Sequence, residues 1–250
     1  MRAALFSVSW LWWSVGGILL VLFAVVLIGT YTFLPPLIGS AAGKSIKNEM
    51  GLRNTPEVSL RSDPPPKMLS GSFAQGQISL GDTDFGDVRP RKVTIDLDPF
   101  DLNMMKSVGG GGFVSREPLS GDLRMEVSEK EVARIAGSAS QDIPIEGVEL
   151  EEGEVTVRSG TKLLGVDVPV AVQGSLEILD QELVFEPRRV SAFGFRLPQN
   201  LADELLKEAD FSYPLEDLPY DAKVSRVEVK EGYLIFFGRL ESIPLNAGNG

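Results

Sequence analysis

The chain has 250 residues, of which 43% are hydrophobic, and its 24 basic and 35 acidic residues give a net charge of −11. Because phosphate backbones require clustered cations, this balance predicts that nucleic acid is not a partner. The sequence contains no His and no Cys, which excludes Ser-His and Cys-His nucleophiles, thiolate metal sites and disulfides. We therefore predict a protein that is not an enzyme and that holds neither a metal nor a cofactor.

Residues 1–33 have the composition of a membrane anchor. No charged residue occurs between Ala3 and Gly43, and residues 10–28 form an apolar run of 19 residues. A helix of this length crosses about 30 Å of hydrocarbon. A cleaved signal peptide is the alternative, but its apolar core has only about 7–15 residues and a cleavage site follows closely. We expect an uncleaved single-pass anchor in the cell membrane, with the C-terminal domain extracytoplasmic.

Three further parts follow the expected anchor. Residues 34–53 are predicted to form a membrane-proximal helix that begins at Pro36 and is capped by Gly51. Residues 54–245 form the main domain, and residues 246–250 are a frayed tail.

The main domain is predicted to be rich in antiparallel strands, because apolar and polar residues alternate in it. Two strands present apolar faces formed by Val93, Ile95 and Leu97 and by Val166, Val168, Val170 and Val172. The alternation continues through Leu176 and Ile178, and again through Leu183 and Phe185, around a turn at residues 180–181. Two more hairpins are predicted at the Glu-Gly pairs 152–153 and 231–232, where glycine supplies a positive φ. The similarity of these hairpins reflects either an internal duplication or common hairpin chemistry.

A helix with one apolar stripe is predicted after these strands. It begins at Pro198, and its stripe consists of Leu201, Leu205, Leu206 and Ala209. A sheet with one apolar face beside such a helix suggests that the two cover each other. Either side chains alone or a bound guest fill the space between them, and this is the functional question.

A shorter helix is predicted to begin near Ser128 and to end at Gly137. Ser128 is expected to cap its first turn, with Glu131 completing a capping box and Val127 packing on Val132.

Carboxylates are the only remaining catalytic groups. The tightest clusters are Asp82 with Asp84, and Asp96 with Asp98 and Asp101. A glycoside hydrolase needs two carboxylates that flank a sugar cleft, one of them with a raised pKa. Asp96 and Asp98 alternate with apolar residues instead, which places them on the solvated face of a strand, and hard-cation binding is the alternative.

Apolar residues near the strand-to-helix junction are the better candidates for a binding surface, together with two adaptable methionines. Each of them either packs in the core or lines a groove for an acyl chain. The candidate lining residues are Met104, Met105, Phe193, Phe195, Leu197, Leu201, Leu205 and Phe211.

Short phrases with a characteristic order and spacing run through the main domain. They are PPKMLSG from Pro65, IDLDPFD from Ile95, PLSG from Pro118, FEP from Phe185, VSAFG from Val190, YPL from Tyr213 and LP from Leu218. Over residues 54–245, the chain resembles the LmeA-like phospholipid-binding proteins of the actinobacterial cell envelope.

The resemblance implies an α+β fold in which a curved antiparallel sheet wraps a long helix, similar to tubular lipid-binding domains. It also implies phospholipid binding outside the membrane, and some family members support the elongation of mannose-containing lipoglycans. The family brings no catalytic residues.

Three functional hypotheses follow. The first is a membrane-anchored, extracytoplasmic phospholipid-binding protein that supports lipid handling or lipoglycan assembly in the cell envelope. The second is a non-catalytic scaffold whose partner is an envelope glycosyltransferase. The third is a carboxylate-dependent hydrolase that acts on envelope glycan.

Overall fold

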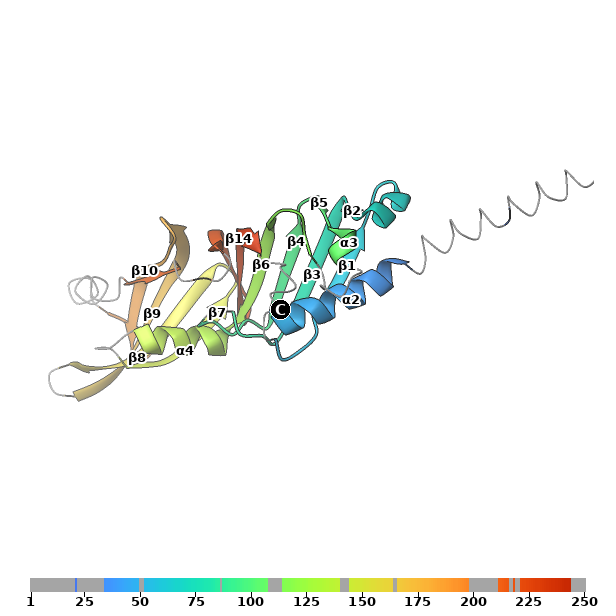
Figure 1. The fold of residues 1–250 in the computed structure, drawn as a ribbon. Coiled ribbons are helices and arrows are strands. Elements are labelled where there is room, and N and C mark those ends of the chain that lie inside the picture. The colour runs from blue at the N-terminus through green and yellow to red at the C-terminus, as the bar shows by residue number, and fades with distance from the viewer. Residues whose placement is uncertain are drawn as a thin grey trace, which may run out of the picture.

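A computed structural model of the chain describes residues 21, 34–49, 52–85, 87–107, 114–139, 144–163, 166–197, 211–215, 218 and 221–243. The expected anchor apart from Val21, the helix predicted from Pro198 and the tail at 246–250 lie outside these residues. Two antiparallel sheets lie side by side in an elongated body, and a helix accompanies each of them (Figure 1). The antiparallel, strand-rich class is therefore confirmed, whereas wrapping of a sheet around the helix at Pro198 stays a prediction.

The first sheet has six strands in the spatial order β1, β3, β4, β6, β14 and β13. They span Glu57–Arg61, Gln75–Gly81, Lys92–Leu97, Leu119–Ser128, Tyr233–Ile243 and Lys223–Lys230. Alternation produces one buried face: the residues predicted to face inward on β4 are all buried, and Leu123 and Leu234 contribute from β6 and β14. The pairing of Ile95 with Leu123 shows that these apolar faces coincide in register.

Helix α2 (Leu34–Glu49) packs against β1 and lies where a membrane-proximal helix is predicted, whereas its predicted cap, Gly51, lies outside the described residues. Ala42 and Ile46 are fully or almost fully buried. Gly43 allows the close approach, because a Cβ there would lie 2.6 Å from the carbonyl oxygen of Pro56. Burial of this apolar stripe makes α2 part of the folded body.

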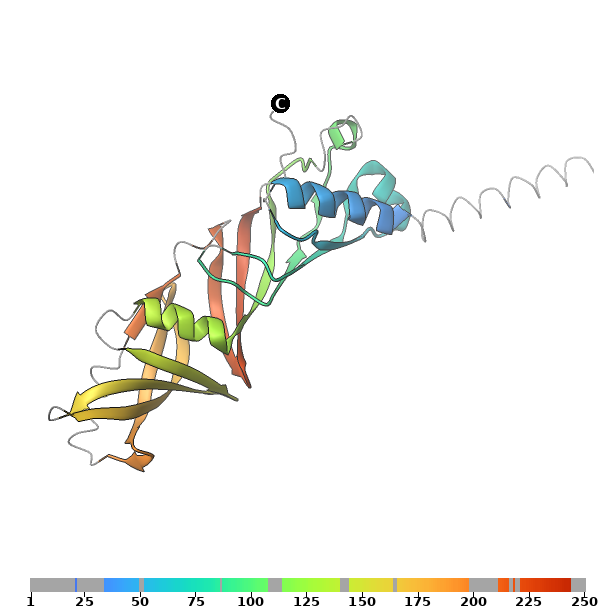
Figure 2. The ribbon, with the colours of Figure 1, turned by 90° about the horizontal axis from the view of Figure 1, so that it is seen from below.

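The second sheet runs in the order β11, β10, β9, β8 and β7, and β12 also pairs with β10. These strands span Phe195–Arg196, Glu182–Ala192, Val166–Leu179, Glu154–Leu163, Ile145–Glu151 and Phe211–Pro214. Val168, Val170 and Val172 are buried along β9, as predicted. The sheet is curled into a half-barrel around the side that carries helix α4 (Glu129–Ala139) (Figure 2).

All three predicted hairpins are present. Gly153 and Gly232 have φ of 75° and 78° at the β7–β8 and β13–β14 turns, and Asp180 and Gln181 have φ of 49° and 62° at the β9–β10 turn. Positive φ at both central residues matches the twist of a two-residue hairpin.

The two sheets meet at β13, the edge strand of the first sheet. At one end, the Gly153 and Gly232 N–H groups donate to the carbonyl oxygens of Val229 and Leu150 at 3.1 and 3.0 Å. At the other end, the side chain of Gln181 bonds the backbone of β13. Between these two ends, β13 faces β9 and β7 of the second sheet.

The remaining elements lie at the far end of the first sheet. They are the 3-10 helix Pro65–Ser70, the paired strands β2 (Ser72–Phe73) and β5 (Phe100–Asp101), and helix α3 (Met104–Lys106). Helices α2 and α4 lie along the same long side of the molecule (Figures 1 and 2). Within the part of the chain that the structure describes, no helix is both long and apolar enough to span a membrane.

Candidate functional site

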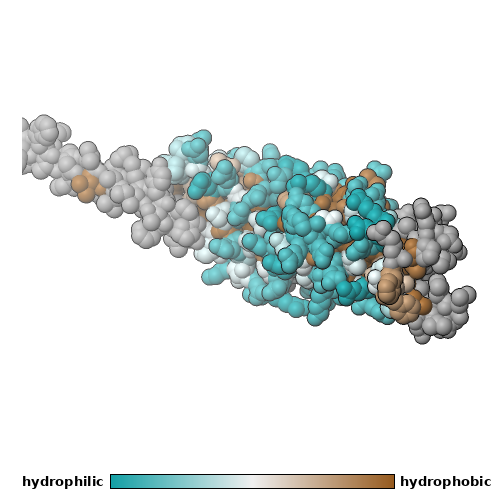
Figure 3. Space-filling view, turned by 180° about the vertical axis from the view of Figure 1, so that it is seen from behind, coloured by the Kyte–Doolittle hydropathy of each residue, from teal (hydrophilic) through white to brown (hydrophobic). Residues whose placement is uncertain are grey.

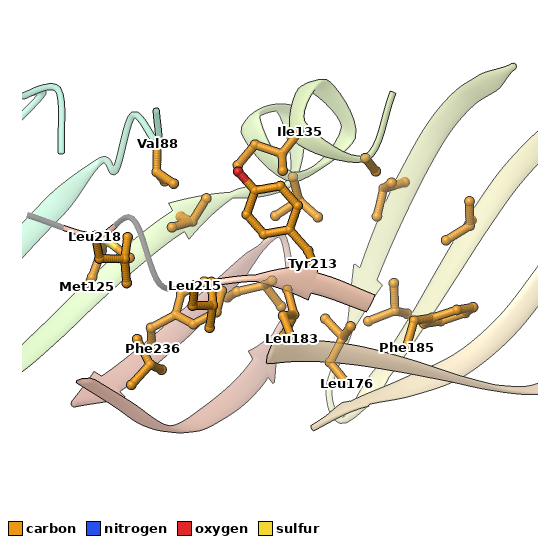
Figure 4. Close-up of a pocket in the computed structure, with 18 residues that line it drawn as sticks. Val88, Met125, Ile135, Leu176, Leu183, Phe185, Tyr213, Leu215, Leu218 and Phe236 are labelled. Atoms are coloured by element: carbon orange, nitrogen blue, oxygen red, sulfur yellow. The ribbon is translucent and has the colours of Figure 1, made fainter. Parts of the chain in front are cut away.

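An apolar pocket of about 60 Å³ lies at the junction of the two sheets beneath α4 (Figure 4). Its lining comes from both sheets, α4, the segment between β3 and β4, and the segment after β12. The residues are Val88, Met125, Val127, Val132, Ile135, Ala136, Val148, Val155, Val157, Leu176, Leu183, Phe185, Tyr213, Leu215, Leu218, Val224, Leu234 and Phe236. The hydroxyl of Tyr213 is the single polar side-chain group among them.

The periodicity of the helix and strand sequences places these side chains on the faces that line the pocket. On α4, Val132, Ile135 and Ala136 are spaced i, i+3 and i+4, so they form one stripe. On β9 and β10, Leu176 is paired with Phe185, and the two side chains lie on the same face of the sheet. In Figure 4, Ile135 lies on one side of the pocket, and Leu176 and Phe185 lie on the opposite side.

The lining determines what this pocket can hold. A polar group that enters would lose its hydrogen bonds to water and find almost no partner, which costs several kcal/mol. An apolar cavity of about 150 Å³ is enough to hold benzene, so the present 60 Å³ is too small for a whole acyl chain. Only a larger space than the one described would admit an acyl chain.

The amide of Gln181 joins the two sheets at one end of the pocket. Its Nε2 donates to the carbonyl oxygen of Val224 at 2.9 Å, and the Val224 N–H donates to its Oε1 at 3.1 Å. The side chain thus pairs with the edge strand β13 as another backbone strand would. Because Val224 also lines the pocket, this contact limits how far the sheets separate.

A polar pocket of about 520 Å³ adjoins the apolar pocket, and Ile135 and Tyr213 line both. The polar pocket is lined by Asp84, Asp87, Arg89, Arg134, Ile135, Ser138 and Tyr213. Asp84 and Arg89 also border a third pocket of about 300 Å³ that carries Arg53 and Arg91. Arginines therefore gather beside the apolar pocket in a chain whose net charge is −11.

Glu131, which is 8% exposed, fixes Arg134 in the polar pocket. Its Oε2 accepts from Arg134 Nε at 2.9 Å, its Oε1 accepts from Arg134 Nη2 at 2.6 Å, and Oε1 also accepts the Arg89 backbone N–H at 2.9 Å. The hydrogen bond from Arg134 lowers the pKa of Glu131 despite the opposing effect of burial, and the same bond raises the pKa of Arg134. Arg134 Nη2 donates as well to the carbonyl oxygen of Asp87 at 2.6 Å.

These contacts correct the prediction of a capping box. The carboxylate of Glu131 bonds Arg134 and the Arg89 N–H instead of the Ser128 N–H, and Ser128 is the last residue of β6. Sequence spacing detects a Glu at the third helical position, but it contains no information on which distant arginine approaches it. Helix α4 also continues through Gly137 to Ala139, within the usual variation of helix ends.

Three carboxylates of the predicted clusters, Asp84, Asp96 and Asp98, contact neighbouring side chains. Asp96 accepts from Gln77 Nε2 at 2.7 Å, and Asp98 accepts from Ser120 Oγ at 2.6 Å and pairs with Arg239. Among the described residues, no group of three or more carboxylates is arranged to hold a metal ion.

The eight candidate lining residues are not brought together in one place. Met105 is 89% exposed on α3, beside the first sheet, whereas Phe193 and Phe195 are 63% and 78% exposed at the turn between β10 and β11. Leu197 packs partly buried against the core. Of these four side chains, none lines the apolar pocket. Their contact with lipid remains a prediction.

The other four candidates are only partly described or not described. Met104 lies in α3, and Phe211 is paired with Phe185 at the start of β12, but the structure describes neither side chain. Leu201 and Leu205 lie outside the described residues. In the space-filling view, hydrophilic residues cover most of the visible face, and hydrophobic residues gather at the end formed by the second sheet (Figure 3).

Sequence reasoning recognised the apolar faces but missed the pocket between them. Leu176, Leu183 and Phe185 belong to the predicted alternating pattern, and all three line the pocket. A pattern assigns a residue to a face, but whether that face meets its partner tightly depends on the curvature of both sheets.

Comparison with known proteins gives one family. The family model described as LmeA-like phospholipid-binding matches residues 29–239, a range that includes every residue lining the apolar pocket and all of both sheets except the last four residues of β14. No curated protein and no solved structure gives a significant match. The match covers most of the chain and agrees with the resemblance drawn from its motifs. The chain belongs to the LmeA-like phospholipid-binding family.

Proposed function

We propose that this chain is a membrane-anchored, extracytoplasmic phospholipid-binding protein that takes lipid acyl chains into the apolar pocket between its two sheets. The observation that carries the proposal is the lining of that pocket, in which 18 residues, most of them from the two sheets and α4, present one polar group. Family membership supports a phospholipid as the ligand.

The driving force is burial of hydrocarbon. Each CH₂ group transferred from water contributes about 0.8 kcal/mol, so about ten buried CH₂ groups provide about 8 kcal/mol before the cost of widening the pocket. Charge pairing inside the pocket is not needed for this binding.

Widening is expected to proceed at the junction of the sheets. There, the second sheet contacts β13 through hydrogen bonds near the two ends of that strand, including the pair between Gln181 and Val224. Rupture of a few exchangeable hydrogen bonds costs less than rearrangement of a continuous β-ladder, because each contributes about 0.5–1.5 kcal/mol net.

The cellular context is part of the proposal. The uncharged run at residues 10–28 supports an uncleaved anchor, and the family supports a role in lipid handling or lipoglycan assembly in the cell envelope. The absence of His and Cys from the sequence favours a non-catalytic protein.

Native mass spectrometry and lipid extraction of the full chain purified in mild detergent test the proposal. We expect phospholipid adducts that Leu176→Asn diminishes, because Leu176 lines the pocket. Leu179→Asn is the matched control on the same strand, since Leu179 is 51% exposed. A lipid-free protein after incubation with vesicles would contradict the proposal and favour the scaffold hypothesis.

A further inference from the structure

We propose that the polar pocket binds the head group of a zwitterionic phospholipid, with the phosphate against Arg134 and Arg89 and the ammonium against Asp87 and Asp84. This inference rests on the proposed function and specifies the lipid class for the same site.

The polar pocket is positioned so that one molecule can occupy it and the apolar pocket together. Ile135 and Tyr213 line both pockets, so a molecule that spans them has an apolar part on one side of these residues and a polar part on the other. In Figure 4, the ring of Tyr213 lies close to Ile135, with its hydroxyl pointing toward the helix. A phospholipid has this division, with its glycerol between the acyl chains and the phosphate.

The guanidinium of Arg134 is held in an orientation that suits anion binding. Its Nε and Nη2 donate to the buried carboxylate of Glu131, and Nη2 also donates to the carbonyl oxygen of Asp87. No described residue accepts a hydrogen bond from Nη1, and the side chain is 44% exposed. A guanidinium that is held in place and has a free edge is suited to phosphate, because little side-chain entropy is lost on binding.

Arg89 supplies a second cation in the same pocket. Its Nε lies 3.3 Å from Asp84 Oδ1, with the side chains 71% and 52% exposed. Exposed ion pairs contribute about 0–1 kcal/mol, so a phosphate can replace Asp84 as the partner of Arg89 at small cost. The Arg89 backbone remains fixed by its N–H bond to Glu131.

The acidic residues determine the kind of head group. Asp84 and Asp87 line the pocket with Arg89 and Arg134, and Glu131 already pairs with Arg134, so three negative charges stand against two positive ones. A phosphodiester with no cation of its own would face both aspartates and a chain of net charge −11. An ammonium group beside the phosphate offsets this repulsion, as in phosphatidylethanolamine.

Competition in mixed micelles tests the proposal with the full chain. The protein is incubated with equimolar dioleoyl-phosphatidylethanolamine, dioleoyl-phosphatidylglycerol and dioleoylglycerol, and retained lipids are counted by native mass spectrometry. A parallel sample receives glycerophosphoethanolamine alone, which carries the head group without acyl chains. We expect wild-type protein to retain phosphatidylethanolamine in preference to the other two lipids and to bind glycerophosphoethanolamine weakly.

Variants separate the contributions of phosphate and ammonium. Arg134→Gln and Arg89→Gln should each reduce retention of both phospholipids about tenfold, the effect of one lost charge-assisted hydrogen bond, and leave dioleoylglycerol unchanged. Asp87→Asn should reduce phosphatidylethanolamine selectively. Arg124→Gln is the control, because Arg124 pairs with Glu126 on β6 and does not line the polar pocket. If loss of Arg134 disturbs folding, Arg89→Gln still tests the phosphate contact, because the Arg89 side chain forms only an exposed ion pair with Asp84 among the described residues.

Three outcomes would overturn the inference. Phosphatidylethanolamine retained equally by wild type, Arg89→Gln and Arg134→Gln would refute the phosphate contact, and equal retention of phosphatidylglycerol would refute the zwitterionic preference. Glycerophosphoethanolamine bound as tightly as the lipid would refute a lipid source for the head group. Failure to retain even dioleoylglycerol would instead contradict the proposed function.

Discussion

Filling the apolar pocket should stabilise the protein and weaken lipid binding at the same time. Ala136 on α4 lines the pocket and is 7% exposed. Ala136→Leu adds three carbons, and Leu has nearly the helix propensity of Ala. A cavity of about 60 Å³ has room for at least two of the three added carbons, because roughly 10–15 Å³ of such space holds one group of the size of water. Two buried carbons at about 0.8 kcal/mol each predict a gain of about 1.6 kcal/mol.

Thermal unfolding of the delipidated protein, followed by circular dichroism, measures this gain. At about 2–4 °C per kcal/mol for a chain of this size, Tm should rise by about 3–6 °C. The new side chain should also exclude about two CH₂ groups of lipid, which weakens retention by about 15-fold.

Ala133→Leu provides the matched control. It introduces the same change on the same helix, but Ala133 is not among the lining residues. It should leave lipid retention unchanged. A lower Tm for Ala136→Leu together with unchanged lipid retention would refute the reasoning, since it would mean that the cavity is neither empty nor the place where lipid binds.

Three predictions concern the elements that support the pocket. Gln181→Ala should lower stability by about 1–3 kcal/mol, because it leaves the fully buried Val224 without its N–H acceptor, and amide exchange at Val224 should accelerate. Glu131→Gln should lower stability by about 1.5–3 kcal/mol at neutral pH. Since the folded-state pKa of Glu131 is lowered, its contribution is complete above the unfolded-state pKa and disappears as the pH falls through the folded-state value, so wild type and variant should converge in acid. Gly174→Ala should destabilise by about 1–3 kcal/mol, because its Cβ would overlap the carbonyl oxygen of the neighbouring strand, whereas Gly147→Ala, which meets nothing within 4 Å, should be tolerated.

Denaturant unfolding checks these values, and each prediction has its own contrary result. Asparagine accepts a positive φ readily but has a shorter side chain than glutamine, so wild-type stability of the Gln181→Asn variant would argue that the bonds to β13 contribute nothing. An unchanged pH dependence in Glu131→Gln would show that the carboxylate is not responsible for it. Equal stabilities of the two glycine variants would contradict the close strand packing at Gly174.

The hairpins and their buried faces were predictable because they depend on local patterns. Alternation along β9 and the Glu-Gly pairs determine strands and turns within about ten residues of chain. The role of Gln181 was not predictable, since the turn places its side chain against Val224, which is 43 residues away. Glu131 illustrates the same limit: a local capping pattern was present, but Arg134 and the backbone of Arg89 occupy its carboxylate.

In the candidate site too, local sequence patterns predicted which residues share a face, but not which distant elements those residues contact. Leu176 and Phe185 were recognisable as apolar residues on one face, whereas their meeting with α4 and the first sheet depends on how the second sheet curls. Phe193 and Phe195 were predicted to line a groove because they are apolar and lie near the strand-to-helix junction, and the turn between β10 and β11 leaves both exposed. Hydrophobicity identifies side chains for which burial is favourable, but it does not identify the element that buries them.

Photo-crosslinking with a phospholipid that carries a diazirine near the end of one acyl chain tests most directly whether lipid occupies the pocket. The full chain is irradiated with this lipid, and the modified residues are identified by peptide mass spectrometry. Modification at lining residues such as Leu176, Val157 and Phe236, reduced by Ala136→Leu, is the predicted result. Modification confined to Phe193, Phe195 or residues 1–33 would contradict it, because the acyl chain would then lie on the surface or along the expected anchor.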